Sequence, residues 1–150
     1  MRRILIFFIS LLLYQCEESP TKEIHFSDIS KVPIIKASLN NKPCYLMVDT
    51  GASISILDIT QTKSYNFKVF NVANEVLGIG GKSKYFGLSN VNVQLDSINL
   101  SDSFHGGDLS FLVKTIELNS GFKIVGIIGS DVFKAQGFKI DYYTNSIKYQ

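Results

Sequence analysis

The chain has 150 residues, of which 45% are hydrophobic, 19% charged and 12% aromatic. That is the length of one ordinary domain, and the hydrophobic share is too high for a disordered chain. Its only arginines, Arg2 and Arg3, lie at the N-terminus, and beyond residue 16 the 13 lysines balance 13 Asp and Glu. A neutral domain without arginine lacks the basic surface that nucleic acid requires, so we expect no nucleic-acid partner.

Residues 1–16 have the pattern of a signal peptide. Two arginines precede the apolar run 4–14 (ILIFFISLLLY), which as a helix would rise about 16 Å, roughly half the hydrocarbon core of a bilayer. Cys16 and the polar residues after it resemble a bacterial lipoprotein signal, in which this cysteine carries the lipid. Ordinary secretion and an uncleaved anchor are the alternatives. All three place the domain outside the cytoplasm, and lipidation would anchor it in the cell envelope, on the periplasmic or the outer-membrane face. Residues 17–31 are predicted to be a polar tether.

From residue 32 onward, short apolar or alternating runs separated by turns predict strands. Six such runs precede a closing hairpin at 137–149: 32–39, 44–48, 66–72, 91–95, 109–113 and 124–128. The segment 130–136 is the one expected helix, with Ser130 as its cap and Gly137 at its end. The prediction is a small, closed, all-β domain with one short helix near the C-terminus.

The two cysteines exclude an intrachain disulfide framework and a Cys-rich zinc site, because Cys16 belongs to the signal segment and Cys44 is then alone. Cys44 is expected to be a small buried hydrophobe within a strand. The segment 105–108 (HGGD) offers too few ligands for a metal and is interpreted as a solvated loop. Asp58 and Asp141 are expected to have surface or local hydrogen-bonding roles.

The segment 48–53 (VDTGAS) carries the clearest chemical signal. An apolar strand leads into Asp49, and Thr50 and Gly51 then form a turn. Gly51 permits a tight turn and brings its amide close to the Asp49 carboxylate. The Thr50 hydroxyl can bond across to a partner loop and hold it in place.

Two further segments accompany this turn. Residues 77–82 (LGIGGK) form a glycine-rich tip between strand-like arms, and residues 127–133 (IIGSDVF) run from two aliphatics and a glycine into the expected helix. With the closing hairpin, these segments resemble the retropepsin-like aspartic peptidases, single-lobed relatives of pepsin, over residues 32–150. Ser130 and Asp131 stand where the retroviral enzymes often carry Arg and Asn.

The resemblance implies a retropepsin-like acid-protease barrel and the following residue roles. Asp49 would be the catalytic aspartate, Thr50 the loop-locking hydroxyl and Gly51 the turn glycine. The substrate-binding residues would be Ala52 and the tip of the flap, which comprises Gly78, Ile79, Gly80 and Gly81. No metal or other cofactor is implied, because carboxylates activate the water.

Because the chain holds a single Asp-Thr-Gly, the resemblance implies a homodimer in which each subunit gives one Asp49. The leading hypothesis is an aspartic endopeptidase that acts on peptides or proteins. The main alternative is a non-catalytic envelope module that binds a peptide or protein in the same groove. A third hypothesis pairs Asp49 with an in-chain carboxylate such as Asp131.

Overall fold

The computed structural model of the chain describes residues 20–27, 32–78 and 81–150. Cys16, Ile79, Gly80 and the signal segment lie outside the described residues. The strands and helices, in chain order, are β1 (Lys22–His25), β2 (Ile34–Leu39), β3 (Lys42–Val48), β4 (Ser55–Asp58), η1 (Ile59–Gln61), α1 (Thr62–Tyr65), β5 (Lys68–Gly78), β6 (Gly81–Ser89), β7 (Val93–Leu95), β8 (Ile98–Asn99), η2 (Ser101–Ser103), β9 (Phe104–Gly107), α2 (Ser110–Ser120), β10 (Ile124–Ile128), α3 (Ser130–Gln136), β11 (Lys139–Asp141) and β12 (Ser146–Tyr149).

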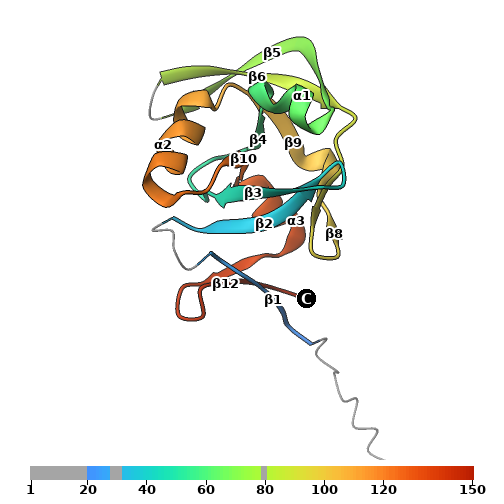
Figure 1. Ribbon diagram of the computed structural model, residues 1–150. Coiled ribbons are helices and arrows are strands. Elements are labelled where there is room, and N and C mark those ends of the chain that lie inside the picture. Colours follow the sequence, from blue (N-terminus) through green and yellow to red (C-terminus); the bar gives the residue numbers. More distant parts are fainter. Residues whose placement is uncertain (1–19, 28–31, 79–80) are drawn as a thin grey trace, which may run out of the picture.

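Two sheets organise the fold (Figure 1). The larger has the strand order β5-β6-β9-β4-β10-β3-β2-β7-β8, and the smaller has the order β1-β12-β11. In the larger sheet β10 runs parallel to β3 and antiparallel to β4, and β4 runs parallel to β9. The predicted all-β acid-protease fold is confirmed.

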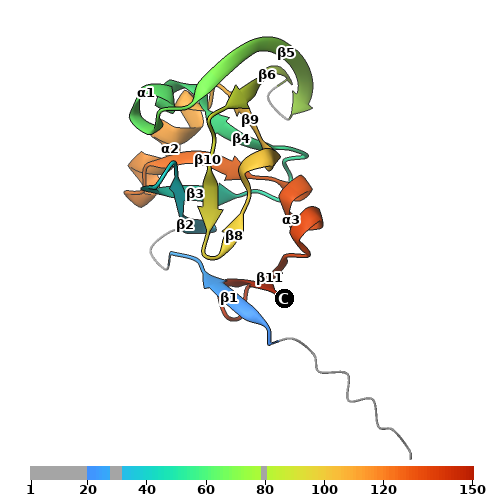
Figure 2. The same ribbon diagram turned by 90° about the vertical axis from the view of Figure 1, so that its right-hand side faces the viewer.

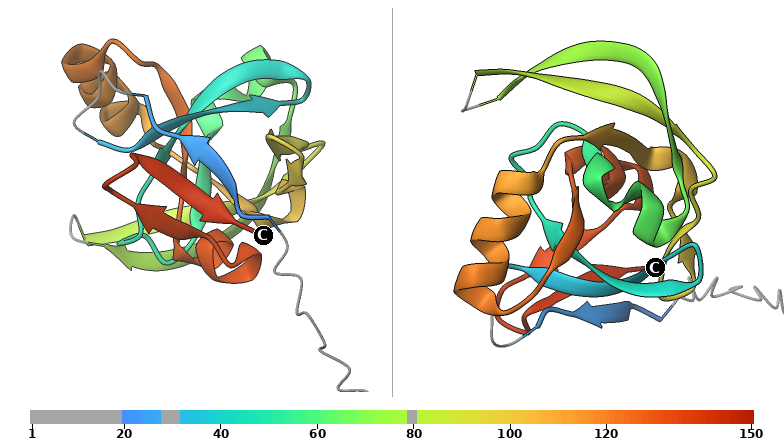
Figure 3. Two further views of the ribbon diagram at one scale, coloured as in Figure 1. Left: turned by 90° about the horizontal axis from the view of Figure 1, so that it is seen from below. Right: turned by 45° about the horizontal axis from the view of Figure 1, so that its top comes forward.

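The larger sheet is open, in contrast to the closed barrel that the sequence predicted. Among the described residues its end strands, β5 and β8, do not pair with each other. The physical reason lies in the long β5–β6 ribbon, which joins the rest of the sheet through β6 at the pair Phe86–Gly106. The ribbon then arches away from the sheet, as the right-hand panel of Figure 3 shows.

The central strands are buried on both faces. Val125 and Ile128 of β10 belong to the main core, whereas Ile124 and Ile127 belong to a second apolar cluster beneath α2. This double burial explains why β10 reads as a continuous apolar run rather than an alternating one.

The predicted tether contains a strand. β1 pairs antiparallel with β12, and the next residue, Phe26, is only 8% exposed and belongs to the main core. Ile24, two residues before Phe26, packs against the same core. The segment 22–26 is therefore part of the folded domain.

The helices differ from the prediction in one important place. The run 109–113 was expected to be a strand, but it enters helix α2, which buries Val113 and Ile116. The helix ends at Gly121, whose φ of 75° is left-handed and whose N–H bonds the Glu117 carbonyl. A five-residue apolar run cannot distinguish a strand from a helix, and the three-residue spacing of the buried positions decides for the helix.

The other helices and strand β9 match the prediction only in part. α3 is confirmed with the predicted bounds and ends at Gly137, but its N-cap is Gly129 rather than Ser130. The short helix α1 was not predicted. The segment expected as a solvated loop at 105–108 largely forms strand β9, in which His105 packs edge-on against the Tyr85 ring, 5.0 Å between centroids.

No helix among the described residues is long and apolar enough to cross a membrane.

Candidate active site

The Asp49 loop, residues 49–54, links the end of β3 to the start of β4. Its first residue is fixed to the neighbouring strand, because the Asp49 N–H donates to the Ile128 carbonyl at 2.9 Å. The loop then turns back on itself, since the Ala52 N–H donates to the Asp49 carbonyl at 3.0 Å. The Gly51 N–H donates to Asp49 Oδ1 at 2.9 Å, which is the contact that the sequence of the turn predicted.

The far side of the loop is clamped to the start of α3. Both the backbone N–H and the hydroxyl of Ser130 donate to the Ala52 carbonyl, at 2.8 and 2.9 Å. Gly129 lies so close to the loop that a Cβ built on it would stand 2.7 Å from the Ile54 carbonyl oxygen and 2.9 Å from that of Ala52. Only glycine allows this approach without a shift of the loop backbone.

A buried polar network locks the same elements together. Ser55 is fully buried, and its hydroxyl accepts from the Gly129 N–H at 2.9 Å while donating to Asp131 Oδ1 at 2.7 Å. The Ser55 N–H donates to the other oxygen of Asp131 at 2.9 Å. Asp131 therefore ties α3 to β4, and it is more than an acidic residue in a first helical turn.

The exposed side of the loop carries the residues expected to do chemistry. Asp49 is half-buried, whereas Thr50, Gly51 and Ser53 are exposed. The Ala52 side chain instead packs inward, against the apolar cluster beneath α2. The loop thus displays a carboxylate on an accessible face while its backbone is held by two neighbouring elements.

The other acidic groups near this loop are engaged elsewhere. Both oxygens of Asp131 accept hydrogen bonds from Ser55, and Oδ1 also accepts one from the Val132 N–H. Asp58 is fully buried, binding the Thr60 N–H and hydroxyl and, at 3.3 Å, the Leu109 N–H. Its local role was predicted, but its burial and its link to the start of α2 were not.

The strands on either side of the glycine-rich segment pair as a hairpin. β5 and β6 pair as far as Gly78 and Gly81, which lie opposite each other. The ribbon arches over the part of the molecule where β4 and β10 lie (Figures 1 and 3). Gly78 and Gly81 belong to the predicted flap, and Ile79 and Gly80 lie outside the described residues.

Sequence reasoning missed Ser55. The available signal was a serine within the apolar strand-like run 54–57, since a buried hydroxyl needs a partner. That partner, Asp131, lies 76 residues away, so the sequence could not identify it.

Comparison with known families agrees with this geometry. Residues 35–132 match the sequence profile of a family described as "Aspartyl protease", and this stretch contains the Asp49 loop, the flap strands and the Gly129–Asp131 clamp. The chain belongs to the aspartyl protease family. No curated protein sequence matches it.

Three solved structures share the fold. EIAV protease, complexed with the inhibitor HBY-793, is 19% identical with a TM-score of 0.56, and the match covers 77% of this chain and 97% of that one. A retropepsin-like aspartic protease from Rickettsia conorii is 20% identical with a TM-score of 0.54, covering 87% and 91%. The retroviral protease-like domain of Ddi1 from Leishmania major is 18% identical with a TM-score of 0.53, covering 79% and 88%.

Proposed function

We propose that this chain is an aspartic endopeptidase that works as a homodimer. The observation that carries the proposal is the Asp49 loop, whose carboxylate lies on an accessible face while Ile128, Gly129 and Ser130 hold its backbone. A catalytic carboxylate needs a fixed position, and a clamped loop supplies it. Membership of the aspartyl protease family supports this assignment.

The proposed chemistry needs two carboxylates that share one proton. Two carboxylates held side by side cannot both be charged at low cost, so one stays protonated. The charged Asp49 takes a proton from water while the neutral one donates its proton to the peptide carbonyl oxygen. The hydroxide oxygen bonds to the carbonyl carbon and gives a tetrahedral intermediate. The carbon–nitrogen bond then breaks as the nitrogen receives the proton that was taken from water, while the other carboxylate recovers its proton from a hydroxyl of the intermediate.

A second copy is the source of the second carboxylate in this proposal. Asp131 at the start of α3 and Asp58 at the end of β4 are both committed to hydrogen bonds within the structure. A two-fold axis through the loop would place two Asp49 side chains together. The substrate would lie extended beneath the two flaps and bond through its backbone like an added strand.

We further propose that the mature protein is anchored in the cell envelope through a lipid on Cys16. The charged start, the short apolar run and the cysteine at its end support this assignment. Two anchored copies would be confined to the membrane surface instead of diffusing through the surrounding solution. This confinement raises their effective concentration and favours the dimer.

The test is digestion of a peptide library by residues 17–150, which retain all of the described core. Wild type and Asp49→Asn are compared from about pH 3 to 7, the range in which a carboxylate pair with a shared proton is expected to titrate. Cleavage by wild type alone is the expected result. Equal cleavage by a folded Asp49→Asn variant would contradict the proposal. Binding of peptides without cleavage would favour the non-catalytic binding module instead.

A further inference from the structure

The turn between β11 and β12 displays two neighbouring tyrosines to solvent. Tyr142 is 70% exposed and Tyr143 is 97% exposed. Adjacent aromatic rings at such exposure are typical of a surface that meets a protein or a membrane. The chemistry of the turn and its place in the fold distinguish between these two partners.

The turn combines apolar rings with polar tips and carries no net charge. Its residues 142–145 read Tyr-Tyr-Thr-Asn. The carboxylate that precedes them, Asp141, is neutralised by Lys148, with 2.7 Å between Oδ2 and Nζ. Tyrosine is enriched where a membrane meets water, because its ring can lie among apolar groups while its hydroxyl stays hydrated. The composition of the turn therefore suits the headgroup region of a bilayer.

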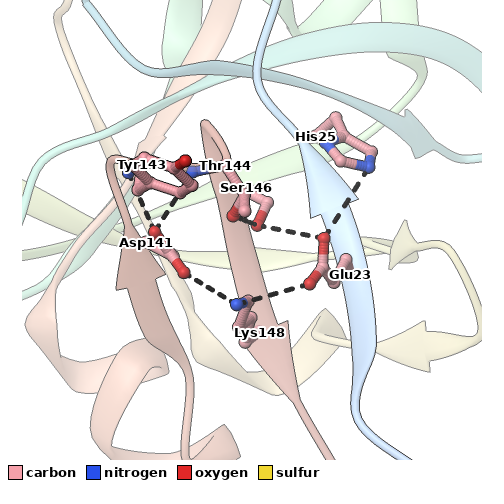
Figure 4. Close-up of polar contacts among 7 residues, drawn as sticks. All are labelled: Glu23, His25, Asp141, Tyr143, Thr144, Ser146 and Lys148. Carbon is pink, nitrogen blue, oxygen red and sulfur yellow. Dashed lines mark hydrogen bonds and ion pairs between the residues drawn. The ribbon is translucent and has the colours of Figure 1, made fainter.

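A polar network holds this turn in one shape (Figure 4). Asp141 Oδ1 accepts from the N–H groups of Tyr143 and Thr144, at 2.8 and 3.1 Å. Lys148, which binds the other oxygen of Asp141, also pairs with Glu23 of β1 at 3.5 Å. The rings are therefore presented on a pre-organised turn, which lowers the entropic cost of binding.

The turn lies at the end of the molecule from which the chain leads to the proposed anchor. β1 pairs with β12 from Lys22 opposite Tyr149 to His25 opposite Ser146, so the turn begins about 10 Å along the sheet from Lys22. Both the turn and the start of β1 lie at the end opposite the β5–β6 ribbon (Figures 1 and 2). The chain from Cys16 to Lys22 spans at most about 20 Å when extended. A lipid on Cys16 would thus hold the turn within reach of the membrane surface.

The charges of the smaller sheet favour the same partner. With His25 neutral, its charged side chains are three lysines and two acids: Lys22, Lys139, Lys148, Glu23 and Asp141. Both acids pair with Lys148, whereas Lys22 and Lys139 are exposed. Basic side chains next to a membrane are attracted to anionic headgroups. The surroundings of the turn therefore do not repel an anionic lipid surface.

We propose that Tyr142 and Tyr143 insert into the headgroup region of the membrane to which the chain is anchored. This inference rests on the lipid anchor proposed at Cys16. A short polar tether alone would let the domain rotate about its attachment point. A second contact at the turn restricts that rotation and holds the β5–β6 ribbon away from the bilayer.

Fluorescence quenching on vesicles tests the proposal. Residues 16–150 are coupled through the Cys16 thiol to a maleimide lipid in vesicles of phosphatidylethanolamine and phosphatidylglycerol. Cys44 does not compete for the maleimide, because it is buried and burial raises the pKa of its thiol. The chain has no tryptophan, so Tyr143→Trp supplies a single reporter. Phe70→Trp is the matched control, since Phe70 is 50% exposed and lies on β5 of the ribbon.

A nitroxide on the lipid headgroup quenches only a reporter that lies in or next to the headgroup region. We expect it to lower the emission of Tyr143→Trp about twofold or more and that of Phe70→Trp by less than about a tenth. Circular dichroism checks that both variants are folded. Equal quenching of the two reporters, or no quenching of Tyr143→Trp, would overturn the proposal.

The unaltered tyrosines provide a second measurement. The coupled and the uncoupled wild-type chain are iodinated with a water-soluble reagent, and peptide mass spectrometry gives the rate at each tyrosine. We expect coupling to slow the reaction of Tyr142 and Tyr143 about fivefold or more and that of Tyr85, on β6 of the ribbon, less than about twofold. Unchanged rates at the turn would contradict the insertion. Protection that grows with the number of chains per vesicle would also overturn it, by showing contact between copies instead.

Failure of the proposed function gives different results. The chemical coupling replaces the natural lipid, so neither measurement depends on how the cell processes Cys16 or on cleavage of a peptide. The anchor fails if the mass of the protein isolated from bacterial membranes shows an unmodified Cys16. The peptidase fails if no peptide is cut. Neither of these outcomes changes the quenching or the iodination of the coupled chain.

Discussion

Ser55 shows how one buried hydroxyl can hold a reactive loop. It is fully buried between β4 and α3, and it accepts from Gly129 while donating to Asp131. Removing the hydroxyl would leave the Gly129 N–H without its acceptor, while Asp131 Oδ1 would keep only the hydrogen bond from the Val132 N–H. A buried group without a partner costs more than the net value of the bond.

We therefore expect Ser55→Ala to lower the free energy of unfolding by about 2–3 kcal/mol. Ser53→Ala is the matched control, because Ser53 lies two residues earlier, in the Asp49 loop, and is exposed. Urea unfolding followed by circular dichroism measures both variants. Equal stability of the two would show that the buried network contributes nothing.

Cys44 is expected to be chemically silent in the folded protein. It is 5% exposed, and burial raises the pKa of its thiol from 9.0 to about 12. Since only the thiolate reacts, the reactive fraction at pH 8 should fall about a thousandfold compared with an ordinary thiol. A disulfide-exchange reagent should label residues 17–150 slowly when native and rapidly in urea. Fast labelling of the native protein would contradict the buried position.

Asp141 makes stability depend on pH. Its hydrogen bond with Lys148 and those with Thr144 and Tyr143 lower the pKa of the carboxyl from 3.8 to about 2. A carboxyl whose pKa is lowered by folding stabilises the protein above its unfolded pKa, and this contribution disappears as the pH falls from about 4 to about 2. The opposing lysine has its pKa raised by the same pair.

Asp141→Asn should therefore melt at a lower temperature than wild type at pH 7, with the difference narrowing below pH 4. The effect should be modest and should shrink in high salt, because the pair is partly exposed. Asp102→Asn, which removes the same charge from an exposed position, is the control. If the difference in melting temperature between Asp141→Asn and wild type did not change with pH, the lowered pKa of Asp141 could not be its cause.

At the scale of elements, the Asp49 loop depends on a glycine that belongs to the start of a helix. Gly129 allows α3 to approach the loop within van der Waals contact of the Ile54 and Ala52 carbonyls. A methyl group there must push against backbone, which cannot yield as a flexible side chain can.

We expect Gly129→Ala to cost about 1–3 kcal/mol of stability and to lower kcat about 100-fold, because the displaced loop carries Asp49. Gly87→Ala is the control, since a Cβ there would meet the Phe70 ring at an ordinary 3.6 Å. Thermal melting and peptide cleavage are measured on both. A fully active Gly129→Ala enzyme would show that the loop tolerates the shift.

The elements also show what the sequence can predict and why it stops. The Asp49 turn, α3 and the closing hairpin were predicted because their signals are local: a tripeptide, a glycine end and a short turn. β1 was missed because it is stabilised by β12, more than a hundred residues away. α2 was misjudged because a five-residue run with four apolar residues fits a strand as well as a helix, and only the packing of Val113 and Ile116 into the second apolar cluster decides. The Ser55–Asp131 bond could not be predicted either, because its two partners lie 76 residues apart in the sequence.

At the scale of the whole molecule, the strand nearest to the proposed anchor and the β5–β6 ribbon lie far apart. β1 and the start of the described chain lie at the opposite end of the molecule from the β5–β6 ribbon, in Figure 1 and again in Figure 2. From Cys16 to Lys22 there are six Cα steps, which span at most about 20 Å. The domain itself is about 35 Å across, as expected for its length.

These lengths set how far from the membrane the proposed lipid anchor would hold each part of the domain. A tether this short would hold the smaller sheet near the headgroups, while the β5–β6 ribbon at the opposite end would lie about a domain's width above the bilayer. Scissile bonds within the first few residues of a neighbouring membrane stalk would be out of reach. Loops of soluble proteins, and stalks of more than about ten extended residues, would reach the height of the ribbon. The anchor would thus restrict substrates by the height of their scissile bond above the membrane, before any subsite selects them by sequence.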